Sequence, residues 1–97
     1  MKIRVQKKQP LVWAVEVKGC HLAYAMYQFD NLDEIKELCE WNFINWNDVV
    51  VDTRMGLIAI PSVGAVTIGC YLVENADTGL EVYDSIEGLQ NFYNIVE

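Results

Sequence analysis

Short apolar runs cut by glycines dominate the hydrophobic pattern between residues 57 and 83. The runs at 57–60 and 65–73 are rich in β-branched and aromatic residues, and a polar stretch at 74–79 leads into an alternating run at 80–83. Side chains of this kind fill a pleated surface, and the glycines mark places where the backbone bends. The pattern therefore predicts an antiparallel meander of strands on which the rest of the chain packs.

Two more strands are predicted at 11–17 and 21–29, joined by a tight turn at 18–19, and a short edge strand at 3–5 precedes them. Both alternating faces of the second strand are largely apolar. An antiparallel sheet that faces water usually has one polar face. We therefore expect this hairpin to be covered on both sides, by a helix and by a partner chain.

The main helix is predicted at residues 31–41. Asp30 and Asn31 are favourable N-cap residues, and Asn31 with Glu34 has the three-residue spacing of a capping box. The apolar residues repeat at helical spacing and form one stripe. They are Leu32, Ile35, Leu38 and Cys39.

The remaining stretches complete an α+β fold. In chain order we expect a loop at 42–47, a strand at 48–53, a turn at 54–56, a short helical turn capped by Asp84 or Ser85 and running to Gln90, and a last strand at 92–96. The sequence thus predicts a single domain, residues 1–97, in which the main helix packs on an antiparallel β-sheet of about five to seven strands.

The composition predicts a contact surface. A single domain of 97 residues buries about 60–65% of its extended-chain surface. The hydrophobic fraction of 53% exceeds the typical value of about 45–50%, so part of the excess is expected in a subunit or ligand interface. Because most soluble oligomers are symmetric assemblies of one chain, we predict a homo-oligomer.

The charge is unevenly distributed along the chain. Four of the seven basic residues lie in the first eight positions, and the rest of the chain carries three basic and fourteen acidic residues. Such a body repels a phosphate backbone, which argues against general nucleic-acid binding. The basic start is interpreted either as an edge strand whose lysines deter aggregation or as a local contact for an anion.

Cysteine usage and hydropathy indicate a cytoplasmic protein. Cys20, Cys39 and Cys70 are an odd number without a paired spacing, which argues against a disulfide framework and for a reducing compartment. The sequence has no signal-peptide pattern, and no apolar run approaches the roughly 18 residues of a membrane-spanning helix. We therefore expect no membrane contact.

Motifs that carry chemistry are sparse. The single histidine, His21, follows Cys20 in a predicted strand, so the two side chains point to opposite faces. The cysteines and His21 lack the paired spacing of metal ligands, and the isolated glycines form no phosphate loop. The sequence predicts no enzyme, no metal site and no cofactor.

The most suggestive segment for binding is residues 40–48, in which Trp41, Phe43 and Trp46 are interleaved with asparagines. Such rings offer stacking planes to a base, and the amides offer hydrogen bonds to its edge. Arg54 is the nearby cation with the geometry to fork onto a phosphate. Two alternatives stay open: the tryptophans anchor the loop to the core, or they form a hot spot for a protein partner.

Scattered pieces of the sequence follow a common order and spacing: residues 2–8 with Pro10, 29–38, 58–61, Gly64, 69–73, Gly79, Tyr83 and 92–97. Together they resemble small phage and prophage proteins of the PGDYG-like group, whose signature is glycine-aspartate-tyrosine followed by two apolar residues. Cys70 stands in place of the signature aspartate, so no role of that aspartate carries over. The resemblance implies a phage or prophage accessory protein, and small proteins of that kind commonly act against host defences.

The leading functional hypothesis is a non-enzymatic phage-type binding protein that counters host antiviral defence from the host cytosol. It would sequester a small nucleotide-derived immune signal at a homo-oligomer interface. The predicted ligand-binding residues are Trp41, Phe43 and Trp46 for stacking, and Arg54, Lys7 and Lys8 for phosphate.

Two alternatives accompany this hypothesis. In the first, an acidic face mimics nucleic acid and occupies a basic groove of a host defence protein, with electrostatic steering that is strongest at low salt. Its residues are Asp33, Glu34, Glu37 and Glu40. In the second, the chain is a virion or assembly component whose apolar faces pack together.

Overall fold

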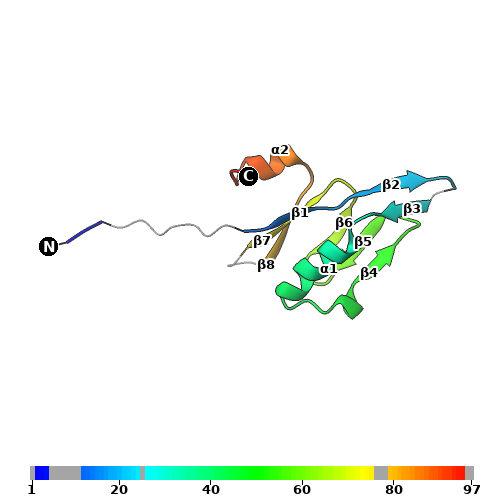
Figure 1. The fold of residues 1–97 in the computed structure, drawn as a ribbon, viewed down its shortest axis with the longest axis horizontal. Coiled ribbons are helices and arrows are strands. Elements are labelled where there is room, and N and C mark those ends of the chain that lie inside the picture. Colours follow the sequence, from blue (N-terminus) through cyan, green and yellow to red (C-terminus); the bar gives the residue numbers. More distant parts are fainter. Residues whose placement is uncertain (1, 5–11, 25, 76–78, 96–97) are drawn as a thin grey trace.

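The computed structural model of the chain describes residues 2–4, 12–24, 26–75 and 79–95 (Figure 1). In these residues, eight strands form three antiparallel sheets beside one main helix and a short C-terminal helix, so the α+β prediction is confirmed. The elements are β1 (Ala14–Glu16), β2 (Gly19–Leu22), β3 (Met26–Phe29), α1 (Leu32–Trp41), the 3-10 helix η1 (Trp46–Asp48), β4 (Val50–Asp52), β5 (Leu57–Ile60), β6 (Gly64–Thr67), β7 (Tyr71–Asn75), β8 (Gly79–Tyr83) and α2 (Ile86–Gln90).

The strands of the predicted meander belong to two different sheets. β5 lies between β4 and β6, whereas β7 lies between β1 and β8. The chain changes sheets at Gly69, whose φ of 97° lies in the left-handed region. There the Gly69 N–H donates to Val17 O, and the Val17 N–H donates to Cys70 O, both at 2.8 Å. These bonds direct the chain toward β1, so the prediction of one continuous meander is wrong.

The predicted turn at 18–19 and the single strand at 21–29 are also wrong. The chain runs from β1 into β2 without reversing, and the reversal lies between β2 and β3, where Tyr24 has a φ of 62° (Figure 1). Gly19 serves another purpose, because a Cβ atom at this position would collide with the carbonyl oxygen of Gln28 on the paired strand. The close approach of β3 requires this glycine.

The strands predicted at the two ends of the chain are absent from the described residues. Residues 2–4 form no strand, and Val5 lies outside the described part. Residues 92–95 form a turn and an irregular segment, and Val96 lies outside as well. The N–H groups of Phe92 and Tyr93 both donate to Leu89 O, so these donors extend the last turn of α2 and do not join a β-ladder.

The other predicted elements form, and some of their boundaries differ from the predicted ones by a few residues. β1 begins at Ala14 within the predicted strand 11–17, whose Leu11 lies outside the described residues. β4 is shorter than the strand predicted at 48–53 because η1 occupies the preceding residues. α1 and α2 confirm the two predicted helices, and Ser85 caps α2 by accepting a hydrogen bond from the Gly88 N–H at 3.1 Å.

One core joins the main helix to two of the sheets. α1 turns Ile35, Leu38 and Cys39 inward, and each is at most 2% exposed. They belong to the same buried cluster as Ile58 of β5 and Leu72 of β7. Removing apolar surface from water is the main stabilising contribution to folding, so this core holds together sheets that do not pair with each other.

Asn31 ties the start of α1 to the segment that links β1 and β2. Its side chain makes no capping hydrogen bond to the helix, so the predicted capping box with Glu34 is wrong. Instead, Asn31 Oδ1 accepts from the Lys18 N–H at 2.9 Å, and Asn31 Nδ2 donates to Glu16 O at 2.6 Å. Asn31 is only 6% exposed, so these bonds satisfy polar groups in a poorly hydrated place.

We expect Asn31→Ala to lower the free energy of unfolding by about 2–4 kcal/mol, because it leaves the Lys18 N–H and the Glu16 carbonyl without their side-chain partner. Urea unfolding followed by circular dichroism measures the loss. The exposed Asn47 provides a matched control, and Asn47→Ala should change the free energy by less than about 0.5 kcal/mol. An Asn31→Ala chain as stable as the unmodified one would show that this side chain does not fix the helix.

Candidate functional site

The structure divides the aromatic segment that follows the main helix. Trp41 ends α1 and is 52% exposed, and Phe43 lies just beyond the helix and is 98% exposed. Trp46 begins η1 and is partly buried against the core. Two of the three predicted stacking rings therefore face solvent, and the third supports the loop.

Phe43 has a strained backbone. Its φ of 62° places it in the left-handed region, where a helix usually ends with glycine. For a residue with a Cβ atom this conformation costs about 1–2 kcal/mol. The Phe43 N–H donates to Glu40 O at 3.1 Å and the Ile44 N–H donates to Cys39 O at 2.9 Å, so the turn closes α1. The ring itself gains almost no contact with the fold in return.

Arg54, the described cation of the predicted set, lies outside the aromatic segment. Arg54 lies in the turn between β4 and β5, where its N–H donates to Asp52 Oδ1 at 3.0 Å. Because β4 runs from η1 to this turn, Arg54 and Trp46 flank opposite ends of the strand. Lys7 and Lys8 lie outside the described residues. The ligand-binding role of the predicted set stays a prediction, and the structure does not gather its described members into one pocket.

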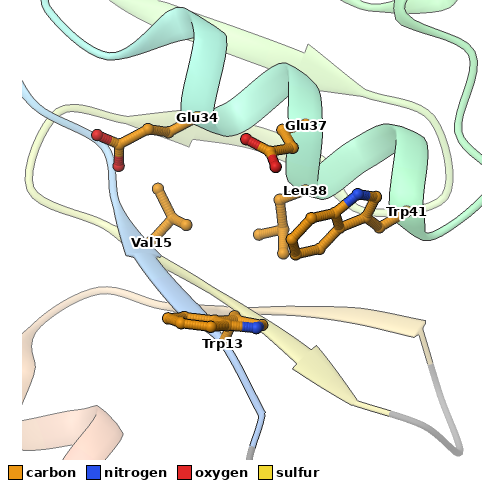
Figure 2. Close-up of a pocket in the computed structure, with 6 residues that line it drawn as sticks. All are labelled: Trp13, Val15, Glu34, Glu37, Leu38 and Trp41. Carbon is orange, nitrogen blue, oxygen red and sulfur yellow. The ribbon is translucent and has the colours of Figure 1, made fainter. Parts of the chain in front are cut away.

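A cleft of about 260 Å³ lies between α1 and β1 (Figure 2). Buried Leu38 and half-buried Val15 give it apolar walls, and larger side chains border them. Its lining consists of Trp13, Val15, Glu34, Glu37, Leu38 and Trp41. Among the described residues of the predicted ligand-binding set, Trp41 contributes to this cleft.

The periodicities of strand and helix bring the lining together. Residues two apart in an extended chain point to the same side, so Trp13 shares a face with Val15 of β1. Residues three, four and seven apart lie on one side of a helix, which aligns Glu34, Glu37 and Trp41 along α1. Figure 2 shows the two glutamates on the helix and the Trp13 ring on the opposite side of the cleft.

The cleft carries negative charge that no ion pair among the described residues neutralises. Glu34 and Glu37 are exposed, and no ion pair joins either of them to another described residue. Lys36 on the same helix pairs instead with Glu40, at 3.9 Å between Lys36 Nζ and Glu40 Oε1. Two carboxylates beside two indole rings attract a cation and repel a phosphate.

A second polar cluster lies at the end of β8. The hydroxyl groups of Tyr83 and Tyr93 both donate to Glu81 Oε2, at 2.8 and 3.1 Å. The hydrogen bond to Glu81 raises the pKa of Tyr83 to about 12, so this phenol stays protonated at neutral pH and does not act as a base. The cluster fastens the segment after α2 to β8, which is a structural role.

The candidate nucleophiles are dispersed among the described residues. His21 lies on β2 with its ring centroid 4.8 Å from that of Tyr27, and Cys20 beside it is exposed. Cys39 and Cys70 are buried, and burial raises the pKa of the Cys39 thiol, which keeps it protonated. In the described part of the chain, no group of three or more His, Cys, Asp and Glu residues is placed to hold a metal ion.

The site has to be interpreted from its own geometry, because no protein family, curated protein or solved structure matches this chain. The resemblance to the PGDYG-like group therefore stays a prediction. None of the helices in the described residues is long and apolar enough to span a membrane.

Sequence reasoning missed Trp13 as a site residue because it interpreted residues 11–17 only as a strand. The signal was the alternation that puts Trp13, Val15 and Val17 on one face. Val17 is fully buried, whereas Trp13 is 66% exposed, so the face that the helix covers ends in an open tryptophan. Glu34 and Glu37 belonged to the predicted acidic face, but the sequence did not tell which strand lies beside them.

We expect the two tryptophans of the aromatic segment to differ in their effect on stability. Trp46→Ala should lower the free energy of unfolding by about 2–4 kcal/mol, because its partly buried ring packs against the core and truncating a fully buried Trp to Ala costs about 3–5 kcal/mol. Trp41→Ala should lower it by less than about 1 kcal/mol, because half of this ring faces water. Chemical denaturation of both variants tests the difference, and equal losses would contradict the division into supporting and exposed rings.

Proposed function

We propose that this chain is a non-enzymatic binding protein that engages a basic surface of a protein partner. The binding surface is the acidic-aromatic face, which we define as Trp13, Glu34, Glu37, Trp41 and Phe43. Aromatic anchors with acidic neighbours suit a partner that is both apolar and positively charged.

The observation that carries this proposal is the geometry of Phe43. A large ring that is 98% exposed and sits at a left-handed backbone position contributes little to the fold and strains it. Trp41, two residues earlier, presents a second ring from the end of α1. Aromatic side chains presented in this way are typical anchors of protein interfaces. A partner surface therefore explains the exposed and strained Phe43, which the fold alone does not explain.

The distribution of charge supports a basic partner over a nucleotide. A nucleotide-derived signal brings phosphate groups that need a cation close to the stacking rings. Arg54 lies beyond the far end of β4, and the carboxylates of Glu34 and Glu37 border the cleft beside Trp41. The net charge of −7 acts in the same direction, because it steers the chain toward positive surfaces.

The resemblance to phage proteins supplies a biological setting for this proposal. A phage accessory protein with an acidic binding face would act in the host cytosol by occupying the nucleic-acid groove of a host defence protein. Asp33 adds an exposed carboxylate to α1, whereas the carboxylate of Glu40 is paired with Lys36. Sequestration of a nucleotide signal is the second candidate, and the experiment below separates the two.

The test is a titration of the isotope-labelled chain with three probes, followed by amide and indole NMR signals. The probes are a peptide of alternating leucine and lysine, the same peptide with glutamate in place of lysine, and a cyclic dinucleotide. We expect the basic peptide alone to shift signals of α1 and Phe43, and the shifts to vanish at about 1 M salt, where the Debye length is about 3 Å. Shifts at Trp46 caused by the dinucleotide, without any caused by the basic peptide, would overturn the proposal.

A substitution at Phe43 separates binding from stability. Phe43→Gly removes the ring and relieves the left-handed strain, so we expect the free energy of unfolding to stay constant or rise by up to about 1 kcal/mol. Binding of the basic peptide should weaken by about fivefold or more, as for an interface anchor. Ser62→Gly is the matched control, because Ser62 is exposed and has a φ of 67° outside the acidic-aromatic face. It should leave binding unchanged.

We further propose that the predicted homo-oligomer forms through the hairpin of β2 and β3. This hairpin projects from the body of the molecule (Figure 1). At its end, Leu22 and Met26 pair across the strands and are 42% and 49% exposed, and Tyr24 between them is 97% exposed. Packing against a second copy would bury this apolar end, which the described part of the chain leaves exposed.

Sedimentation velocity tests this interface. We expect the unmodified chain to form dimers and the double variant Leu22→Ser/Met26→Ser to sediment as a monomer, because it loses the apolar contact between copies. Met55→Ser removes a more exposed apolar side chain from a different turn and should leave the dimer intact. A monomeric unmodified chain would refute the proposal, and large open assemblies would favour the assembly-component alternative.

A further inference from the structure

The cleft between α1 and β1 has a volume that suits one extended side chain. Its volume of about 260 Å³ is below the roughly 300–1,000 Å³ of pockets that hold whole small-molecule ligands. Buried Leu38 and half-buried Val15 line it deeply, whereas the rings of Trp13 and Trp41 border it and stay 66% and 52% exposed. The aliphatic stem of one long side chain would gain apolar contact with this lining, and that contact does not need a larger cavity.

The charged residues of the cleft define the end group of that side chain. Glu34 and Glu37 are one helical turn apart, and both line the cleft opposite Trp13 (Figure 2). Two like charges at this spacing repel each other weakly, and no described residue pairs with either of them. A cationic group placed between the carboxylates and the indole faces would satisfy both, because Trp is the best aromatic partner for a cation.

Among cationic side chains, the arrangement favours arginine over lysine. The guanidinium group is planar and stacks on an aromatic face, and its five N–H donors can serve two carboxylates at once. It is also more weakly hydrated than an ammonium group, so it loses less on entering a mainly apolar cleft. Lysine offers a compact point charge that suits neither the two indoles nor the two separated carboxylates as well.

We infer that this cleft is a socket for a single arginine side chain of the partner. Trp13 and Trp41 pack against the aliphatic stem and the guanidinium plane of that arginine. Glu34 and Glu37 accept hydrogen bonds from its N–H groups. The inference rests on the proposed function, because it names the residue type through which a basic protein partner is recognised. It does not involve Phe43, which would contact a neighbouring part of the same partner.

The test uses the full chain with fluorinated tryptophan, which gives one fluorine signal for each of its three tryptophans. The probes are a short neutral-ended peptide with one central arginine, the same peptide with citrulline, which keeps the shape of arginine without its charge, and the same peptide with lysine. We expect the arginine peptide to shift Trp13 and Trp41 but not Trp46. Citrulline should bind about fivefold or more weakly, and lysine should bind more weakly than arginine.

Substitutions on α1 identify the groups that hold the cation. The double variant Glu34→Gln/Glu37→Gln should weaken binding of the arginine peptide by about tenfold, because it removes both exposed ion pairs with the guanidinium group. Asp33→Asn removes one charge from an exposed position of the same helix that does not line the cleft. It is the matched control and should change the affinity by less than about twofold.

The outcomes distinguish this inference from the proposed function. If citrulline or lysine binds as tightly as arginine, or if Trp13 and Trp41 do not respond, the arginine socket is refuted. In that case, shifts at Phe43 caused by the leucine–lysine peptide would still support a basic protein partner. If neither peptide changes any signal of the acidic-aromatic face, the socket and the proposed function both fail.

Discussion

The whole arrangement depends on the hydrogen bonding of residues 16–18, where one strand leaves its sheet and enters another. Val17 donates to and accepts from the corner at Gly69 and Cys70, so it holds β1 against the start of β7. Asn31 bonds to the flanking Glu16 carbonyl and Lys18 N–H, and the Lys18 carbonyl accepts from the Asp30 N–H at 2.8 Å. Because buried backbone groups need partners, the strand can cross between sheets only where these groups are present. The hydrogen bonds of residues 16–18 therefore fix two sheets and a helix relative to one another.

This crossing also sets the position of the acidic-aromatic face. Asn31 fixes the first residue of α1 beside the end of β1, and the helix then runs back along the strand toward Trp13. Ile35, Leu38 and Cys39 fasten its inner side to the core. The residues of α1 on the side toward β1 therefore keep a fixed position relative to that strand, although the rings and carboxylates that border the cleft are themselves exposed. The core provides the rigidity, and the exposed side chains provide the chemistry.

Local signals in the sequence predicted the elements better than their connections. The amphipathic pattern from Leu32 to Trp41 and the Ser85 cap encode helices within one stretch of chain, and both helices form. Gly19 and Gly69 were ambiguous, because glycine serves turns and close approaches equally well. Only the tertiary structure shows that Gly19 lies under a carbonyl of β3 and that Gly69 directs the chain to β1. For the same reason, the pairing of Trp13 with the acidic side of α1 could not be read from either segment alone.

The cleft joins two segments that the chain keeps apart, one ending in Trp13 and one ending in Trp41. A ligand that contacts both indoles connects the strand to the helix at the end of α1 farther from Asn31. Any such ligand binds the folded chain and has no comparable site in the unfolded one, so its binding free energy adds to the folding free energy. The occupied protein would then resist heat better than the empty one, by an amount that grows with the logarithm of ligand concentration.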